Sequence, residues 1–289
     1  MCTYKRERSQ FYLRIFENPD CISISVNEMV LNLLNILMPE LSETSPKGWK
    51  QSSKYENLFN LWIPENRIDT KMIDYLNEWA EKANSHIWLN VNKNTNKFFR
   101  GDEIDYCLAS DWNFDFTNRI RTTCGEAEYQ LKYQLPKRLV DDKSKRKYVS
   151  ILKEAISDSI ECLPFDISSF FVTTIPAIKE NQSKLSWKLA NYVADRYDSK
   201  FIKSTLLLEK PQMKEQKIED KFKIWTNIYS DLSNLEFSHK VKGKNILIID
   251  DLYQSGVSIW CYATILKKLG AKTVIAITAV KSLKDGDNT

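Results

Sequence analysis

The residues best suited to chemistry lie between positions 243 and 258, where the sequence reads GKNILIIDDLYQSGVS. Residues 246–249 are all apolar, which is typical of a central parallel strand buried on both faces. Two adjacent carboxylates, Asp250 and Asp251, follow this predicted strand. In an open α/β sheet, ligands bind outside the carboxyl ends of the strands. We therefore expect the acid pair at a ligand-binding edge.

The loop after the acid pair is suited to an anion. Residues 254–258 (QSGVS) lead into a predicted helix, whose first backbone N–H groups and dipole attract a phosphate. Ser255 and Ser258 add hydroxyls, and Gly256 allows close approach because it has no Cβ. The same residue types also cap ordinary strand–turn–helix connections. The loop alone leaves both uses open.

Two carboxylates beside a phosphate would repel it unless a neutral or cationic group lay between them. A ribose ring fits, because its hydroxyls donate to carboxylate oxygens while its 5′-phosphate reaches the loop. Mg²⁺ held by ribose hydroxyls and a pyrophosphate would reduce the remaining repulsion. The stretch therefore favours a phosphorylated ribose, with Mg²⁺ arriving on the substrate and no metal site built by the protein.

The pattern ILII-DD-LY-QSGVS resembles the signature that type I phosphoribosyltransferases use to bind phosphoribosyl pyrophosphate (PRPP): an apolar strand, two acids, two variable residues and a Thr/Ser–Thr/Ser–Gly–x–Thr/Ser loop. The resemblance implies an α/β fold with a parallel sheet and helices on both faces. It gives Asp250 and Asp251 the catalytic role of holding the ribose hydroxyls. It gives a substrate-binding role to Tyr253, Gln254, Ser255, Gly256, Val257 and Ser258. Gln254 departs from the family's Thr, Ser or Asp, and an amide cannot serve as the base that purine-salvage members have there.

Upstream segments resemble the same family over about residues 120–285. Residues 170–176 (FFVTTIP) and the following AIKENQSKL look like the strand and loop on the pyrophosphate side, which assigns Pro176, Ala177 and Lys179 to substrate binding, with Lys184 as a further candidate. The segment order is most similar to the competence-associated ComF branch. A GEAEYQLKYQL segment comes first, followed by Gln216 and Asn227, eleven residues apart. The branch usually has an arginine between these two positions, and this sequence has Lys221 and Lys223 nearby instead. The four-cysteine zinc module often found in that branch is missing.

Elements that would position these residues can be read from periodicity and capping. Helices are expected over 27–38, from a cap at Asp69 onward, and over 125–135, 148–163, 183–197, 218–235 and 257–269. Strands are expected at 86–91, 169–175, 204–208, 245–249 and 273–279. Strands alternating with helices indicate a parallel sheet in the second half. We predict an N-terminal Trp-rich domain of mixed or helical structure at 1–110 and a phosphoribosyltransferase-like domain at 111–289.

Composition limits the classes of protein. The 289 residues carry 42 basic and 38 acidic side chains, so the formal charge is +4, too small to indicate nucleic-acid binding by itself. Hydrophobic residues make up 43%, enough for a sizeable core. No apolar run reaches the length of a membrane span, and no secretory signal is visible, so we expect a cytoplasmic protein without a membrane partner. The six cysteines show no metal-ligand spacing and are expected to be reduced and mostly buried.

Three functions follow from these observations. The first is transfer of a phosphoribosyl group from PRPP with Mg²⁺, or the reverse cleavage of a nucleotide, as a glycosyltransferase. The second is a non-catalytic module that binds a nucleotide, PRPP or a nucleic-acid 5′-phosphate, by analogy with proteins of DNA uptake or anti-phage defence. In the third, residues 1–110 bind a nucleic acid, a partner protein or a second copy of this chain. Trp49, Trp62, Trp79 and Trp88 could stack on bases there, although spaced aromatic residues are more often core.

Overall fold

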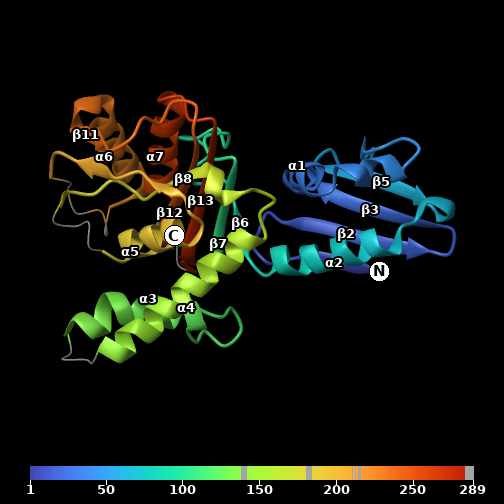
Figure 1. The fold of residues 1–289 in the computed structure, drawn as a ribbon, viewed down its shortest axis with the longest axis horizontal. Helices are drawn as coiled ribbons and strands as arrows, with labels where there is room; N and C mark the ends of the chain where they lie inside the picture. Colours follow the sequence, from blue (N-terminus) through green and yellow to red (C-terminus); the bar gives the residue numbers. More distant parts are fainter. Residues whose placement is uncertain (138–141, 180–183, 210, 212, 214–215, 284–289) are drawn as a thin grey trace. The chain divides into compact units, whose positions relative to one another are not determined.

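The computed structural model describes residues 1–137, 142–179, 184–209, 211, 213 and 216–283. The chain divides into two compact units: Met1–Trp88 with Glu161–Phe165, and Leu89–Ile160 with Asp166–Thr289 (Figure 1). Residues 89–110 thus belong to the second unit, whereas the sequence places them before the domain boundary at 110. The reason is strand pairing: β7 (Tyr106–Trp112) pairs in parallel with β13 (Thr273–Lys281) in the second unit's sheet.

The first unit is built on an antiparallel five-stranded sheet in the order β1-β2-β3-β5-β4. Its strands are β1 (Cys2–Lys5), β2 (Tyr12–Asn18), β3 (Cys21–Asn27), β4 (Lys50–Gln51) and β5 (Leu58–Pro64). The sequence patterns do not predict these strands. Buried and accessible side chains alternate along β3 and the first half of β2, so one face of the sheet is core.

Both predicted helices of this unit are confirmed. α1 (Glu28–Leu37) begins after Asn27, whose side chain accepts from the N–H of Val30. α2 (Thr70–Asn84) begins after Asp69, whose carboxylate accepts from two backbone N–H groups. The prediction that most tryptophans are core holds for Trp79 and Trp88, which are 7% and 0% exposed, but Trp62 is 50% exposed.

The second unit contains the parallel sheet that the sequence predicts. The six-stranded sheet has the order β6-β7-β13-β12-β8-β9, and the pairs from β7 to β9 are all parallel. Its other strands are β6 (Ile87–Leu89), β8 (Phe170–Thr173), β9 (Lys200–Phe201) and β12 (Asn245–Tyr253). The predicted strand at 204–208 instead forms a separate antiparallel pair, β10 (Ser204–Leu206) with β11 (Leu235–Phe237).

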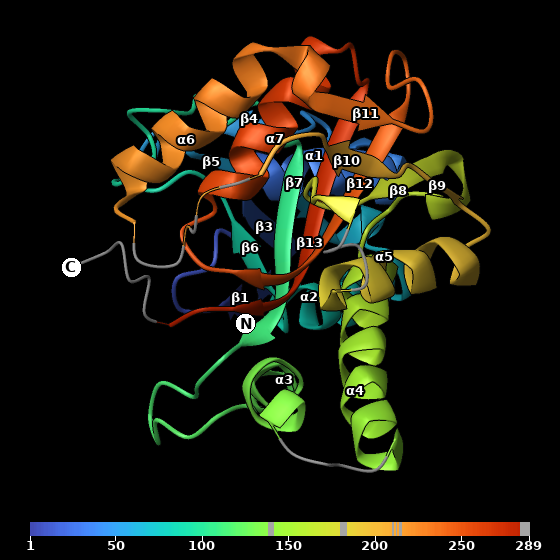
Figure 2. The ribbon, with the colours of Figure 1, turned by 90° about the vertical axis from the view of Figure 1, so that its left-hand side faces the viewer.

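Helices cover both faces of this parallel sheet, as expected for an α/β fold (Figure 2). They are α3 (Thr123–Tyr129), α4 (Asp142–Glu161), α5 (Leu185–Arg196), α6 (Ile218–Ser230) and α7 (Val257–Lys268). α6 ends five residues before the predicted end at 235, because Asp231 is extended and its side chain caps a 3-10 turn at Leu232–Asn234. None of the described helices is long and apolar enough to cross a membrane.

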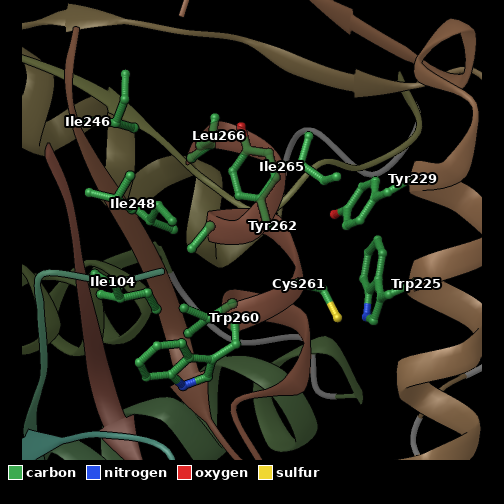
Figure 3. Packing of buried hydrophobic residues seen from close by; sticks show 14 of the residues in the cluster. Ile104, Trp225, Tyr229, Ile246, Ile248, Trp260, Cys261, Tyr262, Ile265 and Leu266 are labelled. Atoms are coloured by element: carbon green, nitrogen blue, oxygen red, sulfur yellow. The ribbon is translucent and has the colours of Figure 1, made fainter. Parts of the chain in front are cut away.

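The core of this unit lies between the sheet and the pair α6–α7. Ile246 and Ile248 of β12 pack in one cluster with Trp260 and Tyr262 of α7 and Trp225 of α6 (Figure 3). The intervening residues of β12 are also fully buried and point to the opposite face, where α5 contacts the strand. A strand buried on both faces holds its carboxyl end rigidly.

Candidate functional site

The acid pair lies within the last residues of β12 rather than in a loop. The strand continues four residues beyond the predicted end at 249, because its pairing with β13 runs on to Tyr253 opposite Lys281. Asp250 sits opposite Thr278 in this ladder, and its Oδ1 accepts from the backbone N–H of Asp251 at 2.9 Å. The carboxylates are therefore presented by a paired strand at the carboxyl edge of the sheet.

The N-terminus of α7 lies directly after this strand and has no side-chain cap. The N-cap is Gly256, in the left-handed region at φ 81°, and no side chain accepts from the first helical N–H groups. The first intrahelical bond joins the N–H of Trp260 to the carbonyl of Gly256 at 2.9 Å. The backbone N–H groups before Trp260 have no partner within the helix, and N–H groups at such an uncapped helix N-terminus are suited to bind an anion.

Ser258 is oriented by a tryptophan. Its Oγ accepts a hydrogen bond from Trp225 Nε1 at 2.8 Å. Because a hydroxyl both accepts and donates, Ser258 keeps its own proton for an anion at the helix N-terminus. Ser255, the other hydroxyl that the sequence singles out, is buried at 6% exposure in the same loop.

Tyr253 supports the loop from within. The residue is 2% exposed, and its Oη accepts from Trp260 Nε1 at 3.0 Å. A Cβ placed on Gly256 would lie 2.1 Å from that Oη. Glycine is thus required at 256 by the tyrosine ring as well as by the positive φ.

One cavity of about 210 Å³ joins the acid pair to the α7 N-terminus. Its lining contains every site residue predicted between 250 and 258. The lining residues are Lys132, Met213, Lys221, Asp250, Asp251, Leu252, Tyr253, Gln254, Ser255, Gly256, Val257, Ser258 and Ile259. The site residues predicted between 250 and 258 therefore lie together at one place in the fold.

The predicted pyrophosphate residues are not part of this lining. Pro176 is buried, Ala177 forms a parallel bridge with Thr205, and Lys179 is exposed. Residues 180–183 of the same predicted loop lie outside the described residues. The assignment of this loop to pyrophosphate stays a prediction.

Sequence reasoning missed Lys132, which reaches the acid pair from a distant segment. It lies in a π-helical stretch, Gln130–Gln134, that continues α3. Its Nζ is 2.9 Å from Asp251 Oδ1 and 3.0 Å from Glu128 Oε1. The spacing of Glu128 and Lys132 was visible as an i,i+4 pair, but nothing in the sequence tied it to Asp251. π-Helical turns occur frequently at functional sites.

Two further lysines flank the loop. Lys281, at the end of β13, donates to the carbonyl of Gln254 at 3.2 Å and to that of Ser282 at 2.9 Å. Lys221 of α6 lines the cavity and is 5% exposed. The sequence suggested Lys221 only as a neighbour of the position where the ComF branch has an arginine.

The charges of this site are strongly coupled. Burial, and after it the neighbouring Asp251 carboxylate, raise the pKa of the Asp250 carboxyl to about 7 against the opposing effect of Lys132. Burial by itself would lower the pKa of the Lys132 ammonium, but Asp251 and Glu128 outweigh it and the pKa is raised. The lysine therefore stays charged and partly neutralises the acids.

The raised pKa of Asp250 predicts a pH-dependent difference in stability between the wild type and Asp250→Asn. The folded state holds this proton more tightly than the unfolded chain, in which the pKa of the Asp250 carboxyl has its ordinary value of 3.8. The stabilising contribution is thus present at low pH and is lost as the pH rises through about 7. We expect the free energy of unfolding of the wild type to fall relative to Asp250→Asn over this window, measured by urea denaturation. A constant difference across the window would contradict the assignment, and the exposed Asp195→Asn is the control.

Comparison with known proteins finds only distant structural similarity. No protein-family model and no curated protein sequence matches this chain. Two crystal structures of a hypoxanthine phosphoribosyltransferase from Staphylococcus aureus are similar to 47% of this chain, over 73% of their own length. Their identities are 13% and 12% and their TM-scores 0.29 and 0.28. At these values the likeness carries no argument about the ligand of this chain.

Proposed function

We propose that the second unit binds a phosphorylated ribose, as PRPP or a nucleotide. One observation carries the proposal: the twin carboxylates and the uncapped N-terminus of α7 line the same cavity. Carboxylates accept from sugar hydroxyls, and helix N-terminal N–H groups bind phosphate. A ligand that carries sugar hydroxyls and a phosphate a few ångströms apart can bind the carboxylates and the helix N-terminus at the same time.

The cavity's size favours a sugar phosphate over a whole nucleotide as the enclosed part. Its volume of about 210 Å³ is below the roughly 300–1,000 Å³ of pockets that enclose drug-sized ligands. The ribose and its 5′-phosphate would lie inside, and the group on ribose C1 would extend outward. Lys132 and Lys221 supply positive charge beside the acids, which limits the repulsion of the phosphate by Asp250 and Asp251.

In the enzymatic form of the proposal, the bond from ribose C1 to the pyrophosphate oxygen breaks through an oxocarbenium-like transition state. Pyrophosphate would leave with the Mg²⁺ that came with the substrate, a lone pair of the acceptor nitrogen forms the new bond to C1, and the proton of that nitrogen passes to water. The chain contributes positioning of the ribose and electrostatic stabilisation of the developing charge. Asp250 and Asp251 hold the ribose hydroxyls, and residues 255–258 hold the 5′-phosphate.

Gln254 favours a second candidate, a module that binds the same ligand without turnover. The side chain lines the cavity at the position where a carboxylate could take a proton from an acceptor base. An amide cannot do this near neutral pH. Binding without chemistry would use the same carboxylates and the same helix N-terminus.

A turnover assay separates the two candidates. The protein is incubated with PRPP, Mg²⁺ and each of a panel of purines and pyrimidines, and pyrophosphate release is measured beside PRPP binding by calorimetry. We expect PRPP to bind in either case, and pyrophosphate release with one acceptor establishes the enzyme. Binding with no release across the panel supports the module, while the absence of PRPP binding would reject both.

A further inference from the structure

The first unit leaves one face of its sheet open. The helices cover the face of Leu13, Ile15 and Ile24, all 0% exposed. Tyr4, opposite Leu13 in the sheet, shows that α2 lies on that side, because its Oη donates to Asn77 Oδ1 of α2 at 2.7 Å. Side chains one position along each strand point the other way. The open face consists of Thr3, Lys5, Tyr12, Arg14, Phe16, Asn18, Cys21, Ser23, Ser25, Asn27, Lys50, Leu58, Asn60, Trp62 and Pro64.

Aromatic rings stand exposed on this face in a regular row. Phe16 of β2 is opposite Ser23 of β3, which is opposite Trp62 of β5. Neighbouring strands are about 4.8 Å apart, so the backbone positions of the two aromatic residues are roughly 10 Å apart across the small serine. Phe16 is 38% exposed and Trp62 50% exposed, which is unusual for such large apolar side chains within strands. The small serine side chain between them leaves part of each ring exposed.

The next row of the open face is polar and ends in cations. Arg14 is opposite Ser25, Ser25 is opposite Asn60, and Asn60 is opposite Lys50. Ser25 Oγ donates to Asn60 Oδ1 at 2.6 Å, so the amide nitrogen of Asn60 keeps its two donors. The guanidinium of Arg14 also lies 5.8 Å from the centre of the Phe16 ring. The row of Arg14 and Asn60, which carry planar hydrogen-bond donors, thus lies next to the row of Phe16 and Trp62.

The charge on this face has one sign. Lys5, Arg14 and Lys50 are its charged side chains, and the described strand residues of the open face include no acid. The chain as a whole carries nearly balanced charge. Three cations around exposed rings therefore make this face complementary to a polyanion with stacking groups.

We propose that the open face of the first unit binds single-stranded nucleic acid. Bases stack on Phe16 and Trp62, while Lys5, Arg14 and Lys50 contact phosphates. A paired duplex does not offer unstacked bases to such rings. A protein partner would favour a continuous apolar patch, whereas Ser23, Ser25 and Asn60 separate the aromatic residues here.

The test uses the full chain and 20-nucleotide single strands, oligo-dT and oligo-U, labelled with fluorescein at the 3′ end. A 5′-hydroxyl on each strand keeps a terminal phosphate from the cavity of the second unit. We expect binding by fluorescence anisotropy at low salt and quenching of tryptophan emission. Trp62→Ala and Phe16→Ala should each weaken binding about tenfold or more, because stacking on an aromatic side chain contributes substantially for each base. Tyr75→Ala, which removes a 48% exposed ring from α2, should have no effect.

Salt dependence tests the cations separately. Each phosphate contact to a single strand contributes about −0.7 to the slope of log K against log salt, so the triple change to glutamine at the three cations should reduce the slope by about 2. A control with the same change in net charge replaces Lys71, Lys188 and Lys268 by glutamine, and its slope should stay as in the wild type. If the variant Asp250→Asn/Asp251→Asn binds the oligonucleotides with the same affinity as the wild type, nucleic-acid binding at the open face is independent of the proposed phosphoribosyl site.

Three results would overturn the proposal: no binding of either strand at about 50 mM salt, equal affinity of the wild type and Trp62→Ala, or equal affinity for duplex and single strand. Circular dichroism of each variant shows whether the unit is folded. If Trp62→Ala unfolds it, Trp62→Phe, which keeps a stacking ring, must retain most of the affinity and Trp62→Leu must lose it. Capture of a protein instead of an oligonucleotide would also count against this occupant.

Discussion

Replacing Asp250 and Asp251 together by asparagine is expected to abolish PRPP binding, with a loss of affinity of at least about a hundredfold. A hydrogen bond to a charged group contributes about 1.5–3 kcal/mol, and two such bonds are lost together. Because 1.4 kcal/mol corresponds to a tenfold change, the sum exceeds a hundredfold. The measurement is isothermal titration calorimetry of the full chain with PRPP and Mg²⁺.

The control for this double variant removes two acids elsewhere on the second unit. Asp195→Asn with Glu236→Gln changes the net charge equally at exposed positions of α5 and β11, and its affinity should match that of the wild type. The double variant also removes the carboxylate that Lys132 contacts at 2.9 Å. This lysine keeps its contact with Glu128 Oε1 at 3.0 Å, so one carboxylate still partly neutralises its charge in the variant. Unchanged affinity would show that the acids do not hold the ribose.

Local signals in the sequence predicted much of the fold because they act over a few residues. The apolar run at 27–38 and the capping side chain of Asp69 each predict a helix, and both helices are confirmed, with Asn27 and Asp69 as their N-caps. The apolar residues 246–249 predict a strand buried on both faces, and all four are 0% exposed. The run from 250 to 258 also predicts which residues share a cavity, because a strand end and the next helix start are adjacent in any such connection.

Long-range pairing is what the sequence did not reveal. β12 extends to Tyr253 because β13 offers partners as far as Lys281, and that register depends on the whole sheet. Lys132 reaches Asp251 only because a π-helical turn ends α3 near the sheet edge. For the first unit the sequence predicts a mixed or helical domain and misses the antiparallel sheet, although residues 21–27 (CISISVN) alternate between apolar and polar side chains. Its five strands form because each pairs with another segment, as β3 does with β5.

The residues of the site therefore come from two different sources in the sequence. The acids and the helix N-terminus come from a contiguous stretch, whose chemistry can be read from residue types. The positive charge that would make the two acids compatible with the proposed phosphate comes from the π-helical stretch Gln130–Gln134 and from α6, through Lys132 and Lys221. A site with acids alone would favour a cation, whereas acids with adjacent lysines favour a ligand that carries both hydroxyls and phosphate.

Gly256→Ala is expected to destabilise the second unit and to remove PRPP binding. The backbone at 256 has φ 81°, a conformation that costs a residue with a Cβ about 1–2 kcal/mol. The new methyl would also lie 2.1 Å from Tyr253 Oη, so the buried ring must move and its bond from Trp260 is strained. Such overpacking typically costs a further 1–3 kcal/mol or so. We expect the free energy of unfolding to fall by about 2–5 kcal/mol in urea denaturation.

Gly243→Ala separates backbone strain from the clash. Gly243 has a similar φ of 74°, but nothing lies within 4 Å of the position its Cβ would take. This variant should lose only the backbone contribution of about 1–2 kcal/mol and should bind PRPP as the wild type does. If the two variants are equally stable, the tyrosine ring gives way freely and does not determine the path of the loop. If Gly256→Ala is less stable yet binds PRPP normally, the phosphate must lie away from the first turn of α7, which would remove the main support for a phosphoribosyl ligand.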